Sequence, residues 1–278
     1  RRLTAYHESG HAIASFFLKN SDPVHYITII PRGAAGGFTW YRKAEDAEDF
    51  TSRGEMFDSI APRYDLLNHL LSFGVDRLWR RRMVGVVAAG TPAAILDVAA
   101  GTGDVAVALA RRLPAARITG IDLSGEMLAV GRGKVARRGL CDRIELVQGD
   151  AERLSFPDGT FDAVTIGFGI RNFGSIEAGL AEAFRVLRPG GRLCILEFST
   201  PRGRCFGPLY RFYFHRILPL VGRLISKDDS AYTYLPESVD HFPDNLLFLR
   251  LMGQAGFAAC RSRRQMRGIA YIYEGRKE

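Results

Sequence analysis

Five short apolar runs dominate the pattern of hydrophobic and polar positions over residues 93–198. Each run has the length of a strand that is buried on both faces. Helical stretches at 103–112, 124–138 and 176–187 separate the first three runs and the last two. Strands that alternate with helices predict βαβ units and a parallel sheet covered on both faces. The runs are AAILDVA (93–99), ARITGID (116–122), IELVQGD (144–150), FDAVTIGFG (161–169) and RLCILEF (192–198).

Further elements are predicted on either side of this region. Beyond it, the pattern predicts an amphipathic stretch at 206–225, a helix near 244–255 and a closing strand pair around 257–275. Near the start, residues 5–18 have apolar positions at helical spacing, and residues 24–30 predict a strand.

A charged segment without an apolar period separates the two parts of the chain, which is typical of a linker. We therefore predict a short N-terminal appendage at 1–40, a linker at 41–55 and a main domain at 56–278.

The net charge of +8 is unevenly placed. Residues 1–50 carry six Lys/Arg and six Asp/Glu, so the whole excess lies in residues 51–278. Such an excess can face nucleic acid, an anionic membrane surface or an anionic cofactor. The basic residues are scattered, without a stripe of aromatic stacking partners, and this disfavours a nucleic-acid-binding module. The four cysteines lie far apart, which predicts a reducing compartment and no metal cluster.

The first apolar run leads through a glycine-containing turn, DVAAGTGD at 97–104, into a helix. Glycine lets the backbone approach a ligand closely, and a helix N-terminus offers free N–H groups. We therefore predict that Asp97, Gly101, Thr102 and Gly103 form part of a cofactor site. A tight turn that holds no ligand is the alternative, because the pattern is permissive.

Carboxylates after the second and third runs sharpen this prediction. Asp122 ends the second run, about 20 residues beyond the glycines, where a carboxylate accepts hydrogen bonds from ribose hydroxyls. Asp150 ends the third run and Ala151 follows it, placed to meet an adenine edge. NAD and S-adenosylmethionine would both suit these positions. Asp104 favours S-adenosylmethionine, because a carboxylate at the helix start would repel a pyrophosphate and tolerate a sulfonium.

Four motifs occur in order along the chain: YDLLNHLLSFGVDRLW (64–79), LDVAAGTGD (96–104), FGIRNF (168–173) and RVLRPGGRLCILEFS (185–199). Together they resemble the C-methyltransferases of ubiquinone and menaquinone biosynthesis. The first motif departs twice from the family pattern Y-D-x-M-N…S…H-x-x-W. Leu67 replaces Met, a side chain of similar volume. Asp76 replaces His, which puts any role of that imidazole in doubt.

The resemblance implies an α/β fold, that of the class I S-adenosylmethionine-dependent methyltransferases: Rossmann-like, with a seven-stranded, mostly parallel sheet. It also implies that Thr102, Asp122, Asp150 and Ala151 contact the cofactor, while Gly167 is either a contact or a close-packed turn. The implied reaction is C-methylation of a reduced polyprenyl quinone precursor. Demethylmenaquinol is the leading candidate for this substrate. The alternatives are 2-methoxy-6-polyprenyl-benzoquinol and, on the same fold, another small molecule.

Methyl transfer to a ring carbon needs an ionised quinol, so the protein must orient it, accept a proton and stabilise the phenolate. The reaction requires no metal. Arg171 and Asn172 are predicted to hold the quinolate oxygen, with Arg171 as an anchor, since it does not readily give up its proton. Tyr64, Asn68 and His69 are predicted to close over the substrate, or else to pack within the entry helix. The identity of the base stays open, and among these residues the His69 imidazole is the group whose ordinary pKa lies nearest to neutral pH.

Residues 204–227 interleave aromatic and aliphatic residues with Arg and Lys. This pattern fits a core helix, or a helix that guides the polyprenyl tail and contacts the membrane surface. The predicted protein is therefore cytoplasmic, with a peripheral contact at the inner face of the membrane left open. A homodimer is left open as well.

A separate motif, HESGH at 7–11, has the H-E-x-x-H spacing. His7 and His11 would bind zinc from one helix face, with Glu8 as the base. Residues 1–39 resemble the start of the peptidase domain of membrane-bound, ATP-dependent zinc metalloproteases. In that family the third ligand comes from a helix well downstream, where this chain has its methyltransferase motifs. We therefore interpret residues 1–40 as an incomplete fragment, with zinc peptidase activity as a remote alternative.

Overall fold

The computed structural model divides into two compact units, residues 1–53 and 54–278. It describes residues 74–201 and 238–278 throughout, and elsewhere residues 24–28, 38–41, 57–58, 61, 72, 207, 210, 212 and 216.

In the first unit, β1 (Val24–Thr28) pairs antiparallel with β2 (Phe38–Tyr41). The strand predicted at 24–30 is thus confirmed over most of its length, whereas β2 was not predicted because four residues give too short a pattern. The helix predicted at 5–18 lies outside the described residues.

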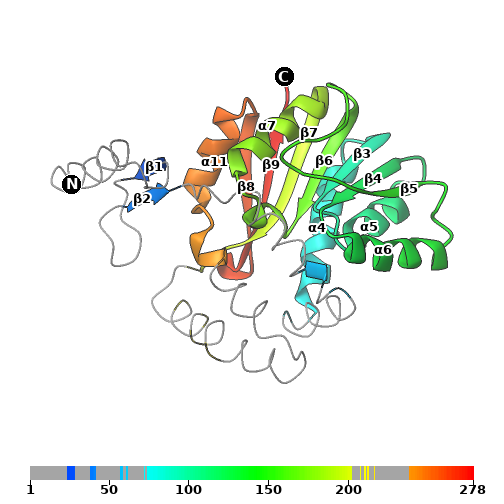
Figure 1. The fold of residues 1–278 in the computed structure, drawn as a ribbon, viewed down its shortest axis with the longest axis horizontal. Coiled ribbons are helices and arrows are strands. Elements are labelled where there is room, and N and C mark those ends of the chain that lie inside the picture. Colours follow the sequence, from blue (N-terminus) through cyan, green and yellow to red (C-terminus); the bar gives the residue numbers. More distant parts are fainter. Residues whose placement is uncertain are drawn as a thin grey trace, which may run out of the picture. The chain divides into compact units, whose positions relative to one another are not determined.

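The second unit is built on a seven-stranded sheet in the order β5-β4-β3-β6-β7-β9-β8 (Figure 1). The pairings among β5, β4, β3, β6 and β7 are all parallel, while β9 is antiparallel to β7 and β8 is antiparallel to β9. The predicted seven-stranded, mostly parallel sheet is therefore confirmed. The strands are β3 (Ala94–Val98), β4 (Arg117–Asp122), β5 (Ile144–Gln148), β6 (Phe161–Gly167), β7 (Leu187–Phe198), β8 (Ala258–Gln265) and β9 (Ala270–Arg276).

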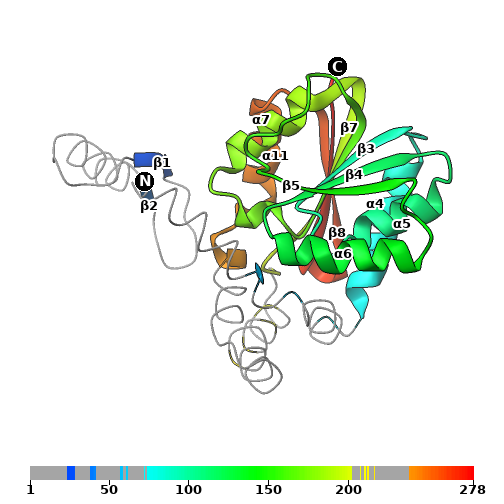
Figure 2. The ribbon, with the colours of Figure 1, turned by 45° about the vertical axis from the view of Figure 1, so that its right-hand side comes forward.

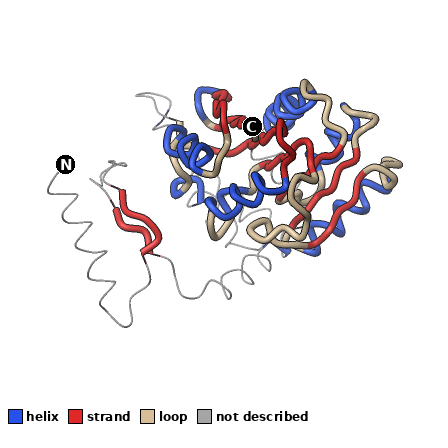
Figure 3. Tube along the Cα trace, turned by 90° about the horizontal axis from the view of Figure 1, so that it is seen from above, coloured by secondary structure: helices blue, strands red, loops and turns tan. Residues whose placement is uncertain are grey.

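Helices cover both faces of this sheet (Figures 2 and 3). The helices α4, α5 and α6 pack on one face, and α7 and α11 pack on the other. All but α4 were predicted, and hydroxyl or carboxylate N-caps define the starts of α6, α7 and α11. The helices are α4 (Val75–Ala88), α5 (Asp104–Arg112), α6 (Gly125–Arg137), α7 (Ile176–Val186) and α11 (Asn245–Gln254).

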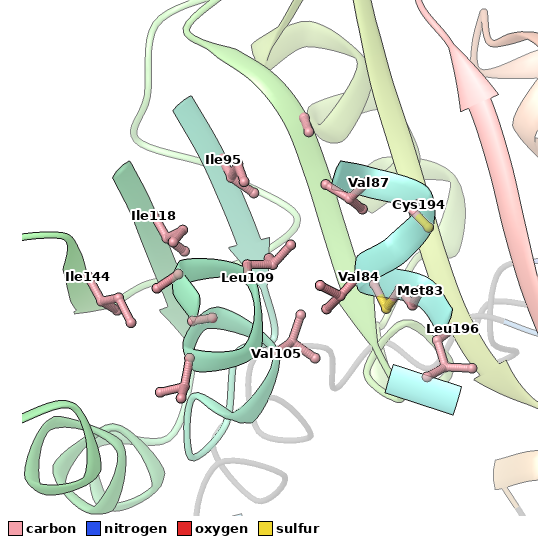
Figure 4. Packing of buried hydrophobic residues seen from close by; sticks show 14 of the residues in the cluster. Met83, Val84, Val87, Ile95, Val105, Leu109, Ile118, Ile144, Cys194 and Leu196 are labelled. Atoms are coloured by element: carbon pink, nitrogen blue, oxygen red, sulfur yellow. The ribbon is translucent and has the colours of Figure 1, made fainter. Parts of the chain in front are cut away.

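The core consists of two apolar layers that share the strands. Successive strand residues point to opposite faces, so Ile95 packs with α4 and α5 while its neighbour Leu96 packs toward α7 and α11. Figure 4 shows the first layer, in which Val105 and Leu109 of α5 lie beside the strand residues. Burial on both faces explains why the strands read as continuous apolar runs.

The strand order reverses next to β3. The chain continues from β3 to β4 and β5 on one side, and returns to β6 and β7 on the other. In open parallel sheets of this kind, ligands bind outside the carboxyl ends of the strands at such a switch point. The fold therefore directs attention to the ends of β3, β4 and β6.

Few residues of the stretch predicted at 206–225 are described, among them Phe212, whose side chain is exposed. Within the part of the chain that the structure describes, no helix is both long and apolar enough to span a membrane.

The α11 helix offers a matched test of the second core layer. Phe248 is fully buried, whereas Leu246 on the same helix is 67% exposed. We expect Phe248→Ala to lower the free energy of unfolding by about 3–5 kcal/mol through lost burial and a residual cavity. Leu246→Ala should change it by less than about 0.5 kcal/mol. Urea unfolding followed by circular dichroism measures both, and equal losses would contradict the packing described.

Candidate cofactor and substrate site

The loop between β3 and α5 lies at the carboxyl end of the sheet, at the switch point. Its backbone is left-handed at Ala99, Gly101 and Gly103, with φ of 53°, 53° and 76°. A Cβ on Gly101 would meet no atom within 4 Å, so the space beside this glycine is open. This open space fits the predicted role of Gly101, which is to let a ligand approach the backbone closely.

Asp122, the last residue of β4, holds the loop in place. Its Oδ2 accepts a hydrogen bond from the Gly101 N–H at 2.7 Å, and its Oδ1 accepts one from the Ser124 N–H at 3.0 Å. Burial raises the pKa of Asp122, while these N–H groups act in the opposite direction. The carboxylate predicted to bind ribose thus lies beside the glycine loop and fixes its backbone.

Asp97 is a buried carboxylate within β3, 1% exposed. Its Oδ1 accepts a hydrogen bond from the Thr165 hydroxyl of β6 at 2.7 Å. Its Oδ2 is also buried and has no hydrogen-bond partner among the described residues. Burial raises the pKa of Asp97 to about 7, although the Thr165 hydroxyl and the Ala106 N–H of α5 lower it in part.

An unpartnered buried carboxylate oxygen is unfavourable unless a ligand supplies a donor. The amino-acid part of S-adenosylmethionine carries an ammonium group that can donate to it. The orphaned oxygen of Asp97 and the open space at Gly101 therefore fit this cofactor. Asp97, Gly101 and Asp122 lie close together, because a single hydrogen bond joins Gly101 to Asp122 and β3 pairs with β4.

Thr102 and Asp104 face α6 and α4. The Lys134 ammonium group of α6 donates to the Thr102 hydroxyl at 2.9 Å and to Asp104 at 2.5 Å. Arg80 of α4 forms a second ion pair with Asp104 at 3.0 Å. Two cations therefore neutralise Asp104, so its negative charge does not select a cationic ligand. Thr102 is buried, and its hydroxyl is directed toward Lys134 of α6.

The remaining predicted cofactor contacts lie at the ends of β5 and β6. Asp150 follows β5, and its Oδ1 accepts a hydrogen bond from the Glu152 N–H at 2.7 Å, which orders the turn containing Ala151. At Gly167, a Cβ would lie 2.9 Å from the Val105 side chain of α5. Close packing against α5 is thus a sufficient reason for this glycine.

Arg171 lies in a short 3-10 turn after β6, where it forms a buried ion pair with Glu197 of β7. Its Nη1 lies 2.7 Å from the Glu197 carboxylate, and the two side chains are 6% and 0% exposed. The same Nη1 donates to the Phe168 carbonyl, and Nε donates to the Ser238 hydroxyl at 3.3 Å. Asn172, the next residue, donates its N–H to the Gly169 carbonyl at 3.0 Å.

Asp76 stands in α4 where the signature has histidine, and it is buried. Its two oxygens accept hydrogen bonds from the Ser72 hydroxyl and from Arg80, each at 2.7 Å. Arg80 in turn pairs with Asp104 of the glycine loop. The substitution therefore provides an anion that Arg80 neutralises, and it joins the first motif to the second.

Sequence reasoning missed Glu197, Lys134 and Arg80. Each makes its contact with a residue 24 or more positions away, and no local pattern marks such partners. Glu197 does stand in the quoted motif RVLRPGGRLCILEFS, which was the available signal.

Six of the predicted residues lie outside the described ones: Tyr64, Asn68, His69, His7, Glu8 and His11. Within the described residues, no cluster of His, Cys, Asp and Glu is arranged to hold a metal ion.

Comparison with protein families gives two matches. The ubiE/COQ5 methyltransferase family matches residues 45–277, and peptidase family M41 matches residues 1–64. The first match includes every described residue of the site.

Individual relatives give the same picture. The ubiquinone/menaquinone biosynthesis C-methyltransferase UbiE of Geobacter sulfurreducens is 48% identical over 261 residues, covering 94% of this chain and 99% of that protein. The demethylmenaquinone methyltransferase of Thermus thermophilus is 50% identical over 220 residues, covering 79% and 99%. A solved structure from Methanococcus maripaludis, described as an S-adenosyl-L-methionine-dependent methyltransferase, shares the fold with a TM-score of 0.56 and 17% identity, covering 79% of this chain and 93% of that chain.

We expect cofactor binding to depend on pH, because Asp97 is the expected partner of the ammonium group and its pKa is raised to about 7. The carboxyl group then ionises between about pH 6 and 8, and only the ionised form attracts an ammonium group. We expect the affinity for S-adenosylhomocysteine to rise over this range, by at most about tenfold per pH unit. Asp97→Asn should bind more weakly and show no such rise. Isothermal titration calorimetry measures this, and an equal slope in both proteins would contradict the role of Asp97.

Proposed function

The chain belongs to the ubiE/COQ5 methyltransferase family and is an S-adenosylmethionine-dependent C-methyltransferase of quinone biosynthesis, and we propose demethylmenaquinol as its substrate. The observation that carries the cofactor assignment is the buried, unpartnered oxygen of Asp97 next to the glycine loop. The substrate follows from the names of the relatives, several of which are demethylmenaquinone methyltransferases.

The cofactor, when bound, supplies an electrophilic methyl group on a sulfonium centre. We propose that Asp97 accepts from its ammonium group and that Asp122 accepts from its ribose hydroxyls with the lone pairs that Gly101 and Ser124 leave free. Gly101 and Gly103 shape the loop backbone, with Thr102 anchoring it to α6 through Lys134. Asp150 and Ala151 border the adenine, and Gly167 lines the floor of the site.

Arg171 and Asn172 are proposed to bind the quinolate oxygen. The Nη1 and Nε atoms of Arg171 are occupied by Glu197, Phe168 and Ser238. Its Nη2 makes no hydrogen bond within the described residues, and it is therefore the donor that remains for a substrate oxygen. Glu197 fixes the plane of the guanidinium group, and a donor held in place before the reaction stabilises the developing phenolate more effectively than a mobile one.

Tyr64, Asn68 and His69 complete the proposed site from the first motif. Their assignment rests on the match of that motif to the family, since they lie outside the described residues. In this proposal they close over the quinol and exclude water, with the His69 imidazole as the candidate proton acceptor.

A direct assay tests the substrate. The protein is incubated with methyl-labelled S-adenosylmethionine and either reduced demethylmenaquinone or the reduced methoxy-polyprenyl-benzoquinone. We expect label in the naphthoquinol product, and no transfer to the oxidised quinones, because only a quinol ionises to an electron-rich ring. Faster transfer to the benzoquinol would reverse the order of the two substrates. Transfer to neither would overturn the proposal.

Arg171→Lys tests the quinolate anchor while keeping a cation beside Glu197. We expect the turnover rate to fall at least about tenfold, since one preorganised donor is lost. Cofactor affinity should stay within about twofold, because the change leaves the contacts of Asp97 and Asp122 intact. Arg188→Lys, in an exposed ion pair with Asp162, is the matched control. An unchanged turnover rate in Arg171→Lys would exclude the anchoring role.

Residues 204–227 are proposed to meet the membrane surface where a polyprenyl quinol resides, which would place the enzyme in the cytoplasm with a peripheral contact at the inner membrane face. Phe212 supports this contact, because its side chain is 59% exposed. Co-sedimentation with anionic vesicles tests the contact, and light scattering after size exclusion distinguishes a monomer from a homodimer.

For the remainder of the chain, we propose an incomplete metalloprotease-like fragment at 1–40, a linker at 41–55 and the methyltransferase domain at 56–278. The M41 match to residues 1–64 supports the origin of the fragment. A zinc content near one ion per chain would contradict its assignment as incomplete.

A further inference from the structure

A pocket of about 440 Å³ lies on the face of the sheet that α4 covers. Small-molecule sites occupy roughly 300–1,000 Å³, so the pocket can hold more than a single ion. It is lined by residues of α4, β7, β8 and β9, including Arg82, Arg192, Arg261, Arg263 and Glu274. Arg192 lies where β7 begins its run beside β9, away from the carboxyl ends of the strands that hold the cofactor loop.

Positive charge is in excess in this pocket. Four guanidinium groups line it, while Glu274 is the one carboxylate among the lining residues. Arg261 and Arg263 pair with the buried Glu274 at 2.7 Å and 3.1 Å. Arg82 and Arg192 have neutral partners instead: the Gln265 side chain at 2.6 Å and the Val86 carbonyl at 2.8 Å.

The hydrogen-bonding capacity of the two neutral-partnered arginines is mostly unused. A guanidinium group has five N–H donors, and Arg82 and Arg192 each use one of them within the described residues. The Gln265 oxygen already accepts a hydrogen bond from Arg82, and its amide donates to the Arg263 carbonyl. The wall therefore presents donors and positive charge.

Edge protection does not account for the whole arrangement. β8 is the edge strand, and charged side chains on an edge strand prevent pairing with another chain (Figure 1). That role could explain Arg261 and Arg263. It does not explain Arg82 and Arg192, which come from a helix and from a strand inside the sheet and converge on the same pocket.

We propose that this pocket binds a phosphate ester. Guanidinium groups that approach from several elements suit a tetrahedral anion with several acceptor oxygens, and such charge-assisted bonds are among the stronger ones. The volume leaves room for the organic group that carries the phosphate. A soluble phosphate ester and a phospholipid headgroup share this chemistry.

The test measures binding of inorganic phosphate and of glycerol 3-phosphate by isothermal titration calorimetry. Saturating S-adenosylhomocysteine is present throughout, so that the helix N-terminus at the glycine loop does not contribute. We expect saturable binding, with the ester at least as tight as the inorganic ion. Arg82→Gln and Arg263→Gln should each weaken it by about tenfold, the effect of one lost charge-assisted hydrogen bond.

Arg137→Gln is the matched control, since this exposed arginine lies at the end of α6 near the opposite edge of the sheet. Thermal unfolding without ligand shows whether each variant folds. If only one of the two pocket variants folds, that variant is enough to test the proposal. No saturable binding, or equal weakening by Arg137→Gln, would overturn the proposal.

A vesicle arm distinguishes the two sources of phosphate. Co-sedimentation compares phosphatidylglycerol vesicles with phosphatidylcholine vesicles. Binding to the former that is lost in Arg82→Gln and kept in Arg137→Gln identifies a lipid headgroup. Calorimetric binding of glycerol 3-phosphate with no such vesicle dependence identifies a soluble ester.

Discussion

The hydrogen bond from the Gly101 N–H to the Asp122 carboxylate is the contact on which the proposed cofactor site depends. It joins the end of β4 to the loop that follows β3, and it fixes the open side of that loop beside the buried oxygen of Asp97. The register of the parallel sheet sets where these groups meet, because Asp97 pairs with Gly120 and Thr165 of the neighbouring strands. Strand pairing therefore sets the positions of these groups. The Asp122 carboxylate at the end of β4 then holds the glycine loop in place.

Much of this arrangement could be predicted from the sequence, since local patterns encode it. Strands buried on both faces read as apolar runs, so the sheet and the loops at its carboxyl edge could be predicted. The positions of Asp97, Gly101 and Asp122 at that edge could be predicted with them. Contacts between distant segments could not be read in this way. The local sequence predicts a free negative charge at Asp104, because its partners Arg80 and Lys134 come from two other helices. Arg171 was recognised from its motif, but its burial against Glu197 depends on the pairing of β6 with β7.

Asp76 shows how a departure from a family signature is accommodated. A buried carboxylate in place of an imidazole needs a cation, and Arg80 one helical turn later supplies it. The result is a continuous polar path from Ser72 through Asp76, Arg80 and Asp104 to Lys134. The path couples the first motif, which is proposed to cover the substrate, to the loop proposed to hold the cofactor.

The position of β9 has a consequence for the synthesis of the protein. β9 follows the other six strands of this sheet in sequence, yet it lies inside the sheet, between β7 and β8. Its pairing continues to Lys277, whose N–H and carbonyl bond to Gly191 and Gly190. Before β9 takes its place, β8 has no neighbour and β7 has an open edge. The sheet can therefore close only after the chain has been synthesised beyond Lys277, and until then two unpaired strands are exposed to other proteins in the cell.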